Sequence, residues 1–172
     1  MAIQKGAKPV DVNQRRIING VEADVIQLYP IKHKFAWEYY NNANANHWLP
    51  TEISMQLDIE QWKSPTALSA DERSAFETVL GVFTTADSIA ANNIVMGFYK
   101  HVTSPEIRMY LLRQAYEEAI HTHAYQYIVE SLGMNESKIF NMYREVDAIY
   151  NKQEFILSFN EGIFDGGFKT GT

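Results

Sequence analysis

Two long helical patterns follow one another in the middle of the chain, and they restrict it to a largely α-helical fold. The first begins at the capping box of residues 69–72, in which the Ser69 hydroxyl and the Glu72 carboxylate each accept a hydrogen bond from the other residue's backbone amide. The second begins at Ser104-Pro105, with serine as the cap and proline at the first helical position, and ends at Gly133. Its roughly 28 residues correspond to a rod of about 40 Å. We expect an all-α fold of long antiparallel helices.

Each of these two helices carries a carboxylate within its apolar stripe. Asp87 lies in the stripe of the first helix, and Glu118 lies in the stripe of the second. The apolar members are Phe76, Leu80, Phe83, Ala90, Ile94 and Phe98 in the first, and Leu111, Ala115, Tyr125, Val129 and Leu132 in the second. A buried acid costs several kcal/mol unless it is paired, protonated or bound to a metal. Because the two acids lie at similar separations from the turn at residues 102–103, antiparallel helices bring them to similar heights, where one metal ion contacts both.

The second helix also contains a Glu-x-x-His motif at Glu118-Ala119-Ile120-His121. On a helix this spacing places the carboxylate and the imidazole on one face, and such donors suit iron or manganese in helical bundles. The motif alone is weak, because 14 glutamates and 5 histidines give roughly 0.4 matches by chance. Tyr125 follows on the same face. A phenol ionises near pH ~10, so at neutral pH it serves beside a metal pair as a one-electron donor rather than as a base.

A purely structural interpretation of the same residues stays open at this point. Glu118 then pairs with a buried Arg or Lys, His121 is a hydrogen-bonded core histidine, and Asp87 caps a neighbouring helix. Tyr125 and Trp48 are packing residues in that interpretation.

The rest of the chain predicts further helices around this pair. We expect a helix over residues 34–44, a short one over 58–62, and a third long helix from 136 to about 157, capped by Asn135. Its inward residues are Ile139, Met142, Val146, Ile149 and Tyr150. Residues 1–33 are expected to be an irregular segment, and residues 34–172 a helical domain that ends in a glycine-rich loop at 165–172.

Composition and charge exclude several classes of protein. The 172 residues include no cysteine, which rules out disulfide scaffolds, thiolate metal sites and a catalytic thiol in this chain. The formal net charge of −6 argues against nucleic acid as a partner. We expect no signal peptide and no membrane-spanning segment, and hence a cytoplasmic protein.

Three motifs between about residues 29 and 155 follow one another at the spacing found in one known protein family. They are Asn46-His47-Trp48-Leu49-Pro50-Thr51-Glu52, Thr85-Ala86-Asp87-Ser88-Ile89 and Glu117-Glu118-Ala119-Ile120-His121-Thr122-His123-Ala124-Tyr125. Together they resemble the small, radical-generating beta subunit of class I ribonucleotide reductases. The resemblance implies a ferritin-like helical bundle that assembles a dinuclear metal centre, activates dioxygen and generates a tyrosyl radical for the reduction of ribonucleotides to deoxyribonucleotides.

The resemblance also implies a role for each matched residue. Asp87 and His121 would ligate one metal ion, and Glu118 would bridge to the second. Tyr125 would hold the stable radical, and Trp48 would relay electrons. Because relatives with phenylalanine at the position of Tyr125 use a mixed manganese–iron centre, the resemblance favours a di-iron (Fe-O-Fe) centre here, with manganese–iron and dimanganese centres as the alternatives.

The family pattern also requires a second Glu-x-x-His and a further glutamate, and this sequence contains one Glu-x-x-His only. The resemblance therefore implies the N-terminal half of a split or truncated beta subunit. Its expected partners are the complementary C-terminal half, the catalytic alpha subunit and a second beta unit. Two other hypotheses stay open: a ferritin-like homodimer with a symmetric di-metal site that acts as an oxidase, and a helical fragment that only scaffolds or regulates a partner.

Overall fold

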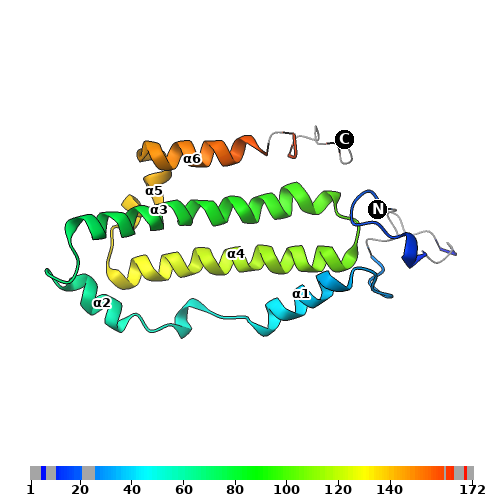
Figure 1. Cartoon of the computed structure of the whole chain (residues 1–172), viewed down its shortest axis with the longest axis horizontal. Helices are drawn as coiled ribbons and strands as arrows, with labels where there is room; N and C mark the ends of the chain where they lie inside the picture. Colours follow the sequence, from blue (N-terminus) through cyan, green and yellow to red (C-terminus); the bar gives the residue numbers. More distant parts are fainter. Residues whose placement is uncertain (1–4, 7–10, 21–25, 161, 165–168, 170–172) are drawn as a thin grey trace. The chain divides into compact units, whose positions relative to one another are not determined.

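The computed structural model describes residues 5–6, 11–20, 26–160, 162–164 and 169 of the chain. The expected glycine-rich loop at 165–172 lies almost wholly outside them. The α-helices are α1 (Lys34–Ala45), α2 (Gln56–Lys63), α3 (Ala70–Asn92), α4 (Pro105–Leu132), α5 (Glu136–Glu145) and α6 (Asp147–Ser158) (Figure 1). Single-turn 3-10 helices form at Val12–Gln14, Pro50–Glu52 and Tyr99–His101, and a π-helical segment forms at Asn93–Phe98. Among the described residues there is no strand, only an isolated bridge between Ile18 and Val102, so the all-α prediction is confirmed.

The chain divides into two compact units, and α3 and α4 pass from one to the other. The first unit comprises Met1–His47, Asn92–Tyr116 and Glu161–Thr172, and the second comprises Trp48–Ala91 and Glu117–Asn160. The boundary expected after residue 33 falls inside the first unit and stays a prediction.

The expected helix ends are largely confirmed by their capping contacts. The Ser69 amide donates to Glu72 Oε2 at 2.8 Å and the Glu72 amide donates to Ser69 Oγ at 3.2 Å, which is the reciprocal capping box. Gly133 follows α4 with φ of 65°, in the left-handed region where glycine is favoured. The Asn135 side chain accepts from the Lys138 amide at 2.9 Å and begins α5.

Two expected helices are interrupted. The helix expected over 136–157 breaks at Val146, whose extended backbone (φ −108°, ψ 108°) ends α5, and Asp147 then begins α6 with an acid in its first turn. The first long helix leaves α-helical geometry after Asn92 and continues as the π-helical segment. Asn92, Asn93 and Gly97 are weak helix formers, so tertiary packing decides the backbone there.

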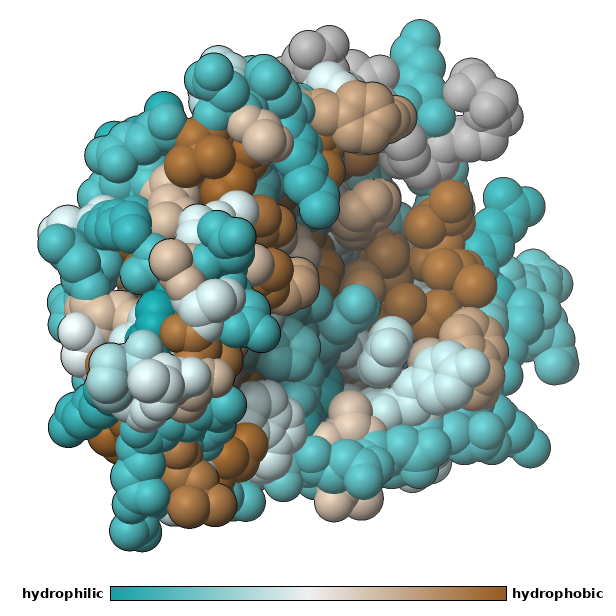
Figure 2. Space-filling model, turned by 60° about the vertical axis from the view of Figure 1, so that its left-hand side comes forward, coloured by the Kyte–Doolittle hydropathy of each residue, from teal (hydrophilic) through white to brown (hydrophobic). Residues whose placement is uncertain are grey.

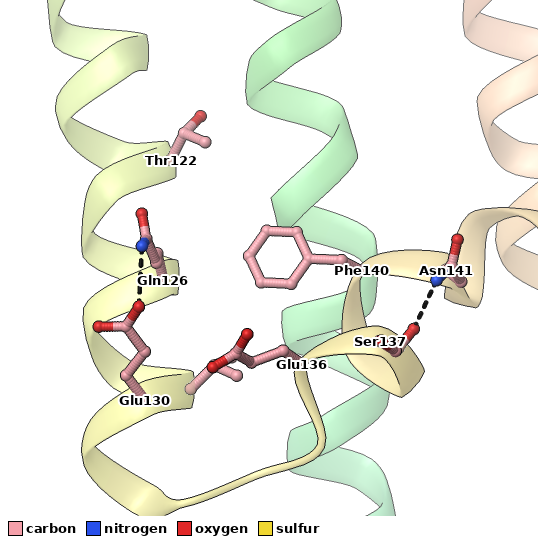
Figure 3. A pocket seen from close by; sticks show the side chains of 8 residues that line it. Thr122, Gln126, Glu130, Glu136, Ser137, Phe140 and Asn141 are labelled. Carbon is pink, nitrogen blue, oxygen red and sulfur yellow. Dashed lines mark hydrogen bonds between the residues drawn. The ribbon is translucent and has the colours of Figure 1, made fainter.

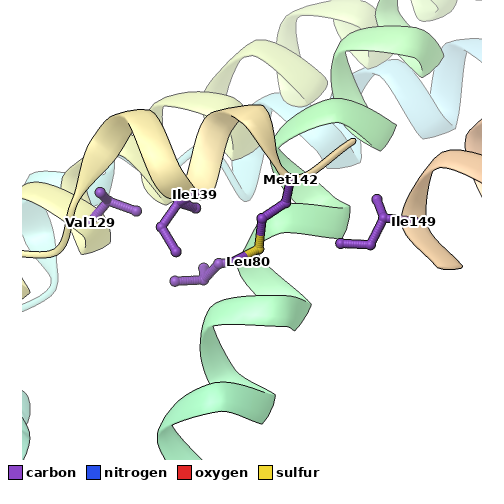
Figure 4. Packing of buried hydrophobic residues seen from close by; sticks show 5 residues of the cluster. All are labelled: Leu80, Val129, Ile139, Met142 and Ile149. Carbon is purple, nitrogen blue, oxygen red and sulfur yellow. The ribbon is translucent and has the colours of Figure 1, made fainter. Parts of the chain in front are cut away.

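The core of the second unit joins four helices. Leu80 of α3, Val129 of α4, Ile139 and Met142 of α5 and Ile149 of α6 form one buried cluster (Figure 4). At Gly81 the backbone of α3 comes so close to α5 that an added Cβ would lie 2.5 Å from Met142 Sδ. Leu80 of α3 packs near Val129 of α4, and Asp87, later in α3, contacts Tyr125, which comes earlier in α4. The two helices are therefore antiparallel, as expected.

The first unit is organised around a buried ionic group at the start of α4. Glu106 is fully buried, and its Oε1 accepts from the backbone amides of Lys32 and His33 at 3.2 and 2.8 Å. Arg15 Nη1 lies 3.6 Å from Glu106 Oε2, and the Arg15 guanidinium also donates to the carbonyls of Gln27 and Pro30. Burial alone raises the pKa of Glu106, but hydrogen bonds from the backbone amides of His33 and Glu106 and from the side chains of Ser104 and His33 outweigh it and lower the pKa below the ordinary value. Arg15, Lys32 and His33 are thereby fixed to the start of α4.

Several apolar residues that were expected in the core are exposed. Phe76, Phe83 and Phe98 of the first stripe are 40–47% exposed, and Tyr150 of α6 is 48% exposed. Figure 2 shows hydrophobic side chains that lie at the surface between hydrophilic ones. The interpretation of these four residues as buried is wrong for this chain, because no described segment covers them.

One helical stretch among the described residues, Ala70–His101, is long and apolar enough to cross a membrane by length and composition. We did not expect such a stretch from the sequence. A core helix of a soluble protein passes the same test, so the support for a membrane span is weak. Only 22% of the apolar window is buried.

Candidate metal centre

Three side chains with metal-binding atoms converge between α3 and α4 in the second unit. Asp87, Glu118 and His121 each offer one ligand atom, and these atoms lie within 4.8 Å of one another. His121 Nδ1 lies 3.2 Å from Glu118 Oε2 and 3.5 Å from Asp87 Oδ2. The three residues are partly buried. The structure therefore brings together all three ligands predicted from the sequence.

Local helical geometry accounts for this convergence. Glu118 and His121 are three residues apart on α4 and share one face, one turn apart. Asp87 comes from α3, which runs antiparallel to α4 at this height. Of the described residues, His121 alone forms ion pairs with either carboxylate. The alternative in which a buried Arg or Lys neutralises Glu118 thus has no support in the contacts of Glu118.

Tyr125 lies next to this group. It contacts α3 through its hydroxyl and through the face of its ring. Its hydroxyl donates to Asp87 Oδ2 at 2.8 Å, and its ring stacks on Phe83 with centroids 5.8 Å apart and planes inclined by 15°. Burial raises the pKa of Tyr125, and the hydrogen bond to Asp87 and the charges of Asp87 and Glu118 raise it further. The phenol is therefore protonated at neutral pH.

Trp48 lies beside His121. The centroids of the two rings are 6.2 Å apart, and Trp48 Nε1 donates to Glu117 Oε1 at 3.0 Å. Sequence reasoning missed Glu117 as the acceptor of this hydrogen bond. Only its position next to Glu118 gave a signal, because a contact between residues 69 positions apart depends on tertiary structure.

Comparison with known families decides where this arrangement belongs. The family model described as ribonucleotide reductase, small chain, matches residues 25–164. The chain belongs to this ribonucleotide reductase small-chain family. The resemblance inferred from the three motifs is thus confirmed.

Relatives and solved structures of the family agree in fold and in the share of the chain that they match. The ribonucleoside-diphosphate reductase subunit beta of Chlamydia pneumoniae is 50% identical over 161 residues, which cover 94% of this chain and 46% of that relative. The ribonucleotide reductase R2 subunit from Clostridium botulinum superposes with a TM-score of 0.77 at 27% identity, covering 92% of this chain and 51% of that one. The dimanganese(II) NrdF of Streptococcus sanguinis shares the fold, with a TM-score of 0.69 at 21% identity, over 83% of this chain and 49% of that one.

The chain thus spans about half the length of these small-chain relatives, and its donor set is correspondingly small. Two carboxylates and one imidazole suit iron or manganese, which accept oxygen and nitrogen ligands. Three donors from two helices are also half of the set in di-metal carboxylate bundles, where four helices contribute. The residues present therefore fit one side of a dinuclear centre.

A pocket of about 370 Å³ lies between α4 and α5 (Figure 3). None of the three candidate ligands lines it. The lining residues are Thr122, Gln126, Val129, Glu130, Glu136, Ser137, Phe140 and Asn141. Gln126 Nε2 donates to Glu130 Oε1 at 2.8 Å on its α4 wall. Among the described residues, Asp87, Glu118 and His121 form the group of three converging ligand atoms, whereas the pocket contributes two glutamates, so we assign the metal to the Asp87–Glu118–His121 group and not to this pocket.

Proposed function

We propose that this chain is one half of the small subunit of a class I ribonucleotide reductase, and that it holds part of a dinuclear metal centre which generates a radical on Tyr125. The observation that carries the proposal is the convergence of Asp87, Glu118 and His121 within 4.8 Å, with the Tyr125 hydroxyl bonded to one of these ligands. The radical then serves the reduction of ribonucleotides by a catalytic alpha subunit.

In this proposal Asp87 and His121 would hold one metal ion, and Glu118 would serve as a ligand shared with the second. A bound metal pair that has reacted with dioxygen supplies the one-electron oxidant. Tyr125 gives up one electron, and its hydroxyl proton moves along the existing 2.8 Å hydrogen bond to Asp87 Oδ2, which leaves a neutral phenoxyl radical. The hydrogen bond to Asp87 gives this proton an acceptor already in place when the electron leaves.

Trp48 is the proposed relay between this centre and the alpha subunit. Its ring centroid lies 6.2 Å from that of His121, one of the three candidate ligands. The hydrogen bond from Nε1 to Glu117 holds the indole in this place. An aromatic ring beside a ligand is a suitable carrier for an electron that enters or leaves the site.

The missing ligands are proposed to come from the complementary half of the family's fold, in a segment outside these 172 residues. Two observations support this. The chain matches about half of its relatives' length. The helical stretch that carries Asp87 is apolar yet mostly uncovered, with only 22% of its window buried, and exposing so much apolar surface is unfavourable. A segment that covers this surface would also bring the remaining donors to the site.

We propose iron as the metal, with manganese–iron and dimanganese centres as alternatives. A redox-active tyrosine at position 125 favours the di-iron form, as the family resemblance implies. The dimanganese(II) relative in Streptococcus sanguinis keeps manganese open.

Electron paramagnetic resonance (EPR) spectroscopy tests the proposal. The chain is co-expressed with the complementary half from a small-chain relative, loaded with ferrous iron without oxygen and then exposed to air. We expect a tyrosyl radical signal that Tyr125→Phe abolishes. Tyr127→Phe is the matched control, because Tyr127 lies on the same helix and donates to the Ile53 carbonyl instead of to a ligand. A signal that survives Tyr125→Phe, or its complete absence from the wild-type assembly, contradicts the proposal.

A further inference from the structure

One face of α3 holds Tyr125 at two points. Phe83 and Asp87 are four residues apart on α3 and therefore share a face. Asp87 accepts the hydrogen bond from the Tyr125 hydroxyl at 2.8 Å, and Phe83 lies against the flat side of the Tyr125 ring, with centroids 5.8 Å apart and planes inclined by 15°. The two contacts restrain different motions of the phenol.

The hydrogen bond alone leaves the ring plane free. A tyrosine ring turns about the line from Cβ to the hydroxyl oxygen. Because the oxygen lies on this line, the rotation leaves it beside Asp87. The intrinsic preference of this torsion is broad. A nearly parallel aromatic neighbour on the flat side, in contrast, is compatible with one ring plane only.

We propose that Phe83 is a positioning residue that sets the ring plane of Tyr125, and through it the orientation in which Tyr125 loses its electron. The second part of this inference rests on the proposed function, in which the oxidised metal pair takes the electron and Asp87 Oδ2 takes the proton. The first part concerns the chain's own residues and does not depend on the metal. Phe83 is 44% exposed, so its packing with other apolar residues is incomplete while its contact with Tyr125 is specific.

Two measurements separate positioning from a general apolar role, and both use the co-expressed assembly. The first is made without metal, by NMR on tyrosine-labelled protein, with Tyr125→Phe to assign the signal. An aromatic ring over the flat side of Tyr125 shifts its ring hydrogens upfield. We expect Phe83→Leu to remove this shift, which confirms the contact, and also to merge the separate signals of the two ring edges of Tyr125, because a ring that is no longer held in one plane turns faster. Phe76→Leu is the matched control, since Phe76 lies on the same helix, is 40% exposed and contacts Trp62 instead, with the two ring planes tilted by 50°.

The second measurement is the hyperfine pattern of the radical. The coupling to the two β-hydrogens of a tyrosyl radical depends on the angle between each Cβ–H bond and the ring plane. We expect one narrow pattern in the wild type and in Phe76→Leu, and a changed or broadened pattern in Phe83→Leu, together with a several-fold faster decay of the radical. An unchanged pattern in Phe83→Leu overturns the positioning role.

The failure of this inference and that of the proposed function are distinguishable. If the wild-type assembly forms no radical on Tyr125, the proposed function fails, and the NMR signals of the two ring edges of Tyr125 decide whether Phe83 sets the ring plane. If the radical forms and its hyperfine pattern is unchanged in Phe83→Leu, the proposed function stands and this inference is wrong.

Discussion

Replacing Leu80 by alanine tests whether the buried cluster of the second unit holds the helices that carry the site. Leu80 is only 4% exposed and contacts residues of α4, α5 and α6. The substitution deletes three carbons, each worth about 0.8 kcal/mol when buried, and leaves a cavity between the helices. Measured Leu→Ala substitutions of this kind cost roughly 2.7–5 kcal/mol. We expect a loss of about 3 kcal/mol in the free energy of unfolding, which is about a hundredfold in the unfolding equilibrium.

The assay is equilibrium unfolding in urea, followed by far-ultraviolet circular dichroism. Leu57→Ala is the matched control, because Leu57 lies in the same unit, on α2, and is 77% exposed. We expect it to change the free energy of unfolding by less than about 0.5 kcal/mol. Equal effects of the two substitutions would refute the assignment of Leu80 to a core that joins α3 to the other helices.

Three further outcomes are expected. Gly81→Ala should lower the free energy of unfolding in urea by up to about 2 kcal/mol, because overpacking against Met142 outweighs the better helix propensity of alanine. A gain in stability would show that α3 and α5 are not in close contact. The ionised Glu106 carboxylate stabilises the fold above its ordinary pKa of 4.5, and this contribution is lost as the pH falls through its lowered pKa. The difference in free energy of unfolding between wild type and Glu106→Gln should therefore shrink in acid. A difference that does not depend on pH argues against an ionised carboxylate. Trp48→Phe should keep the tyrosyl radical in the assembly and abolish its ribonucleotide reduction, whereas Trp62→Phe should leave both intact; full activity of Trp48→Phe would exclude the relay.

The sequence predicted the starts of α3, α4 and α5 and the convergence of the three candidate ligands because both depend on local rules. Capping residues mark the start of α3 within a few positions, and helical periodicity places Glu118 and His121 on one face. The pairing of Asp87 with Glu118 followed from their similar separation from one turn. These are statements about single helices and one short connection, which a sequence pattern can carry.

The remaining features depend on contacts that no local pattern encodes. The break at Val146, where the backbone is extended, has no signal in the helical periodicity. The stack of Phe83 on Tyr125 joins two residues 42 positions apart in sequence. The periodicity of α3 correctly identified an apolar face, but it could not say that this chain leaves Phe76 and Phe83 exposed. An apolar stripe shows that a surface prefers burial, and not which chain buries it.

The number of metal ions bound per chain tests the central claim most directly. The 172-residue chain alone and its assembly with the complementary half are loaded with ferrous iron, freed of unbound metal and analysed by elemental mass spectrometry. We predict two ions per chain in the assembly, their loss in Glu118→Ala, and little tightly bound metal in the chain alone, because three donors complete neither coordination sphere. Stoichiometric binding by the chain alone, as two ions per homodimer, or no binding by the assembly would contradict the account.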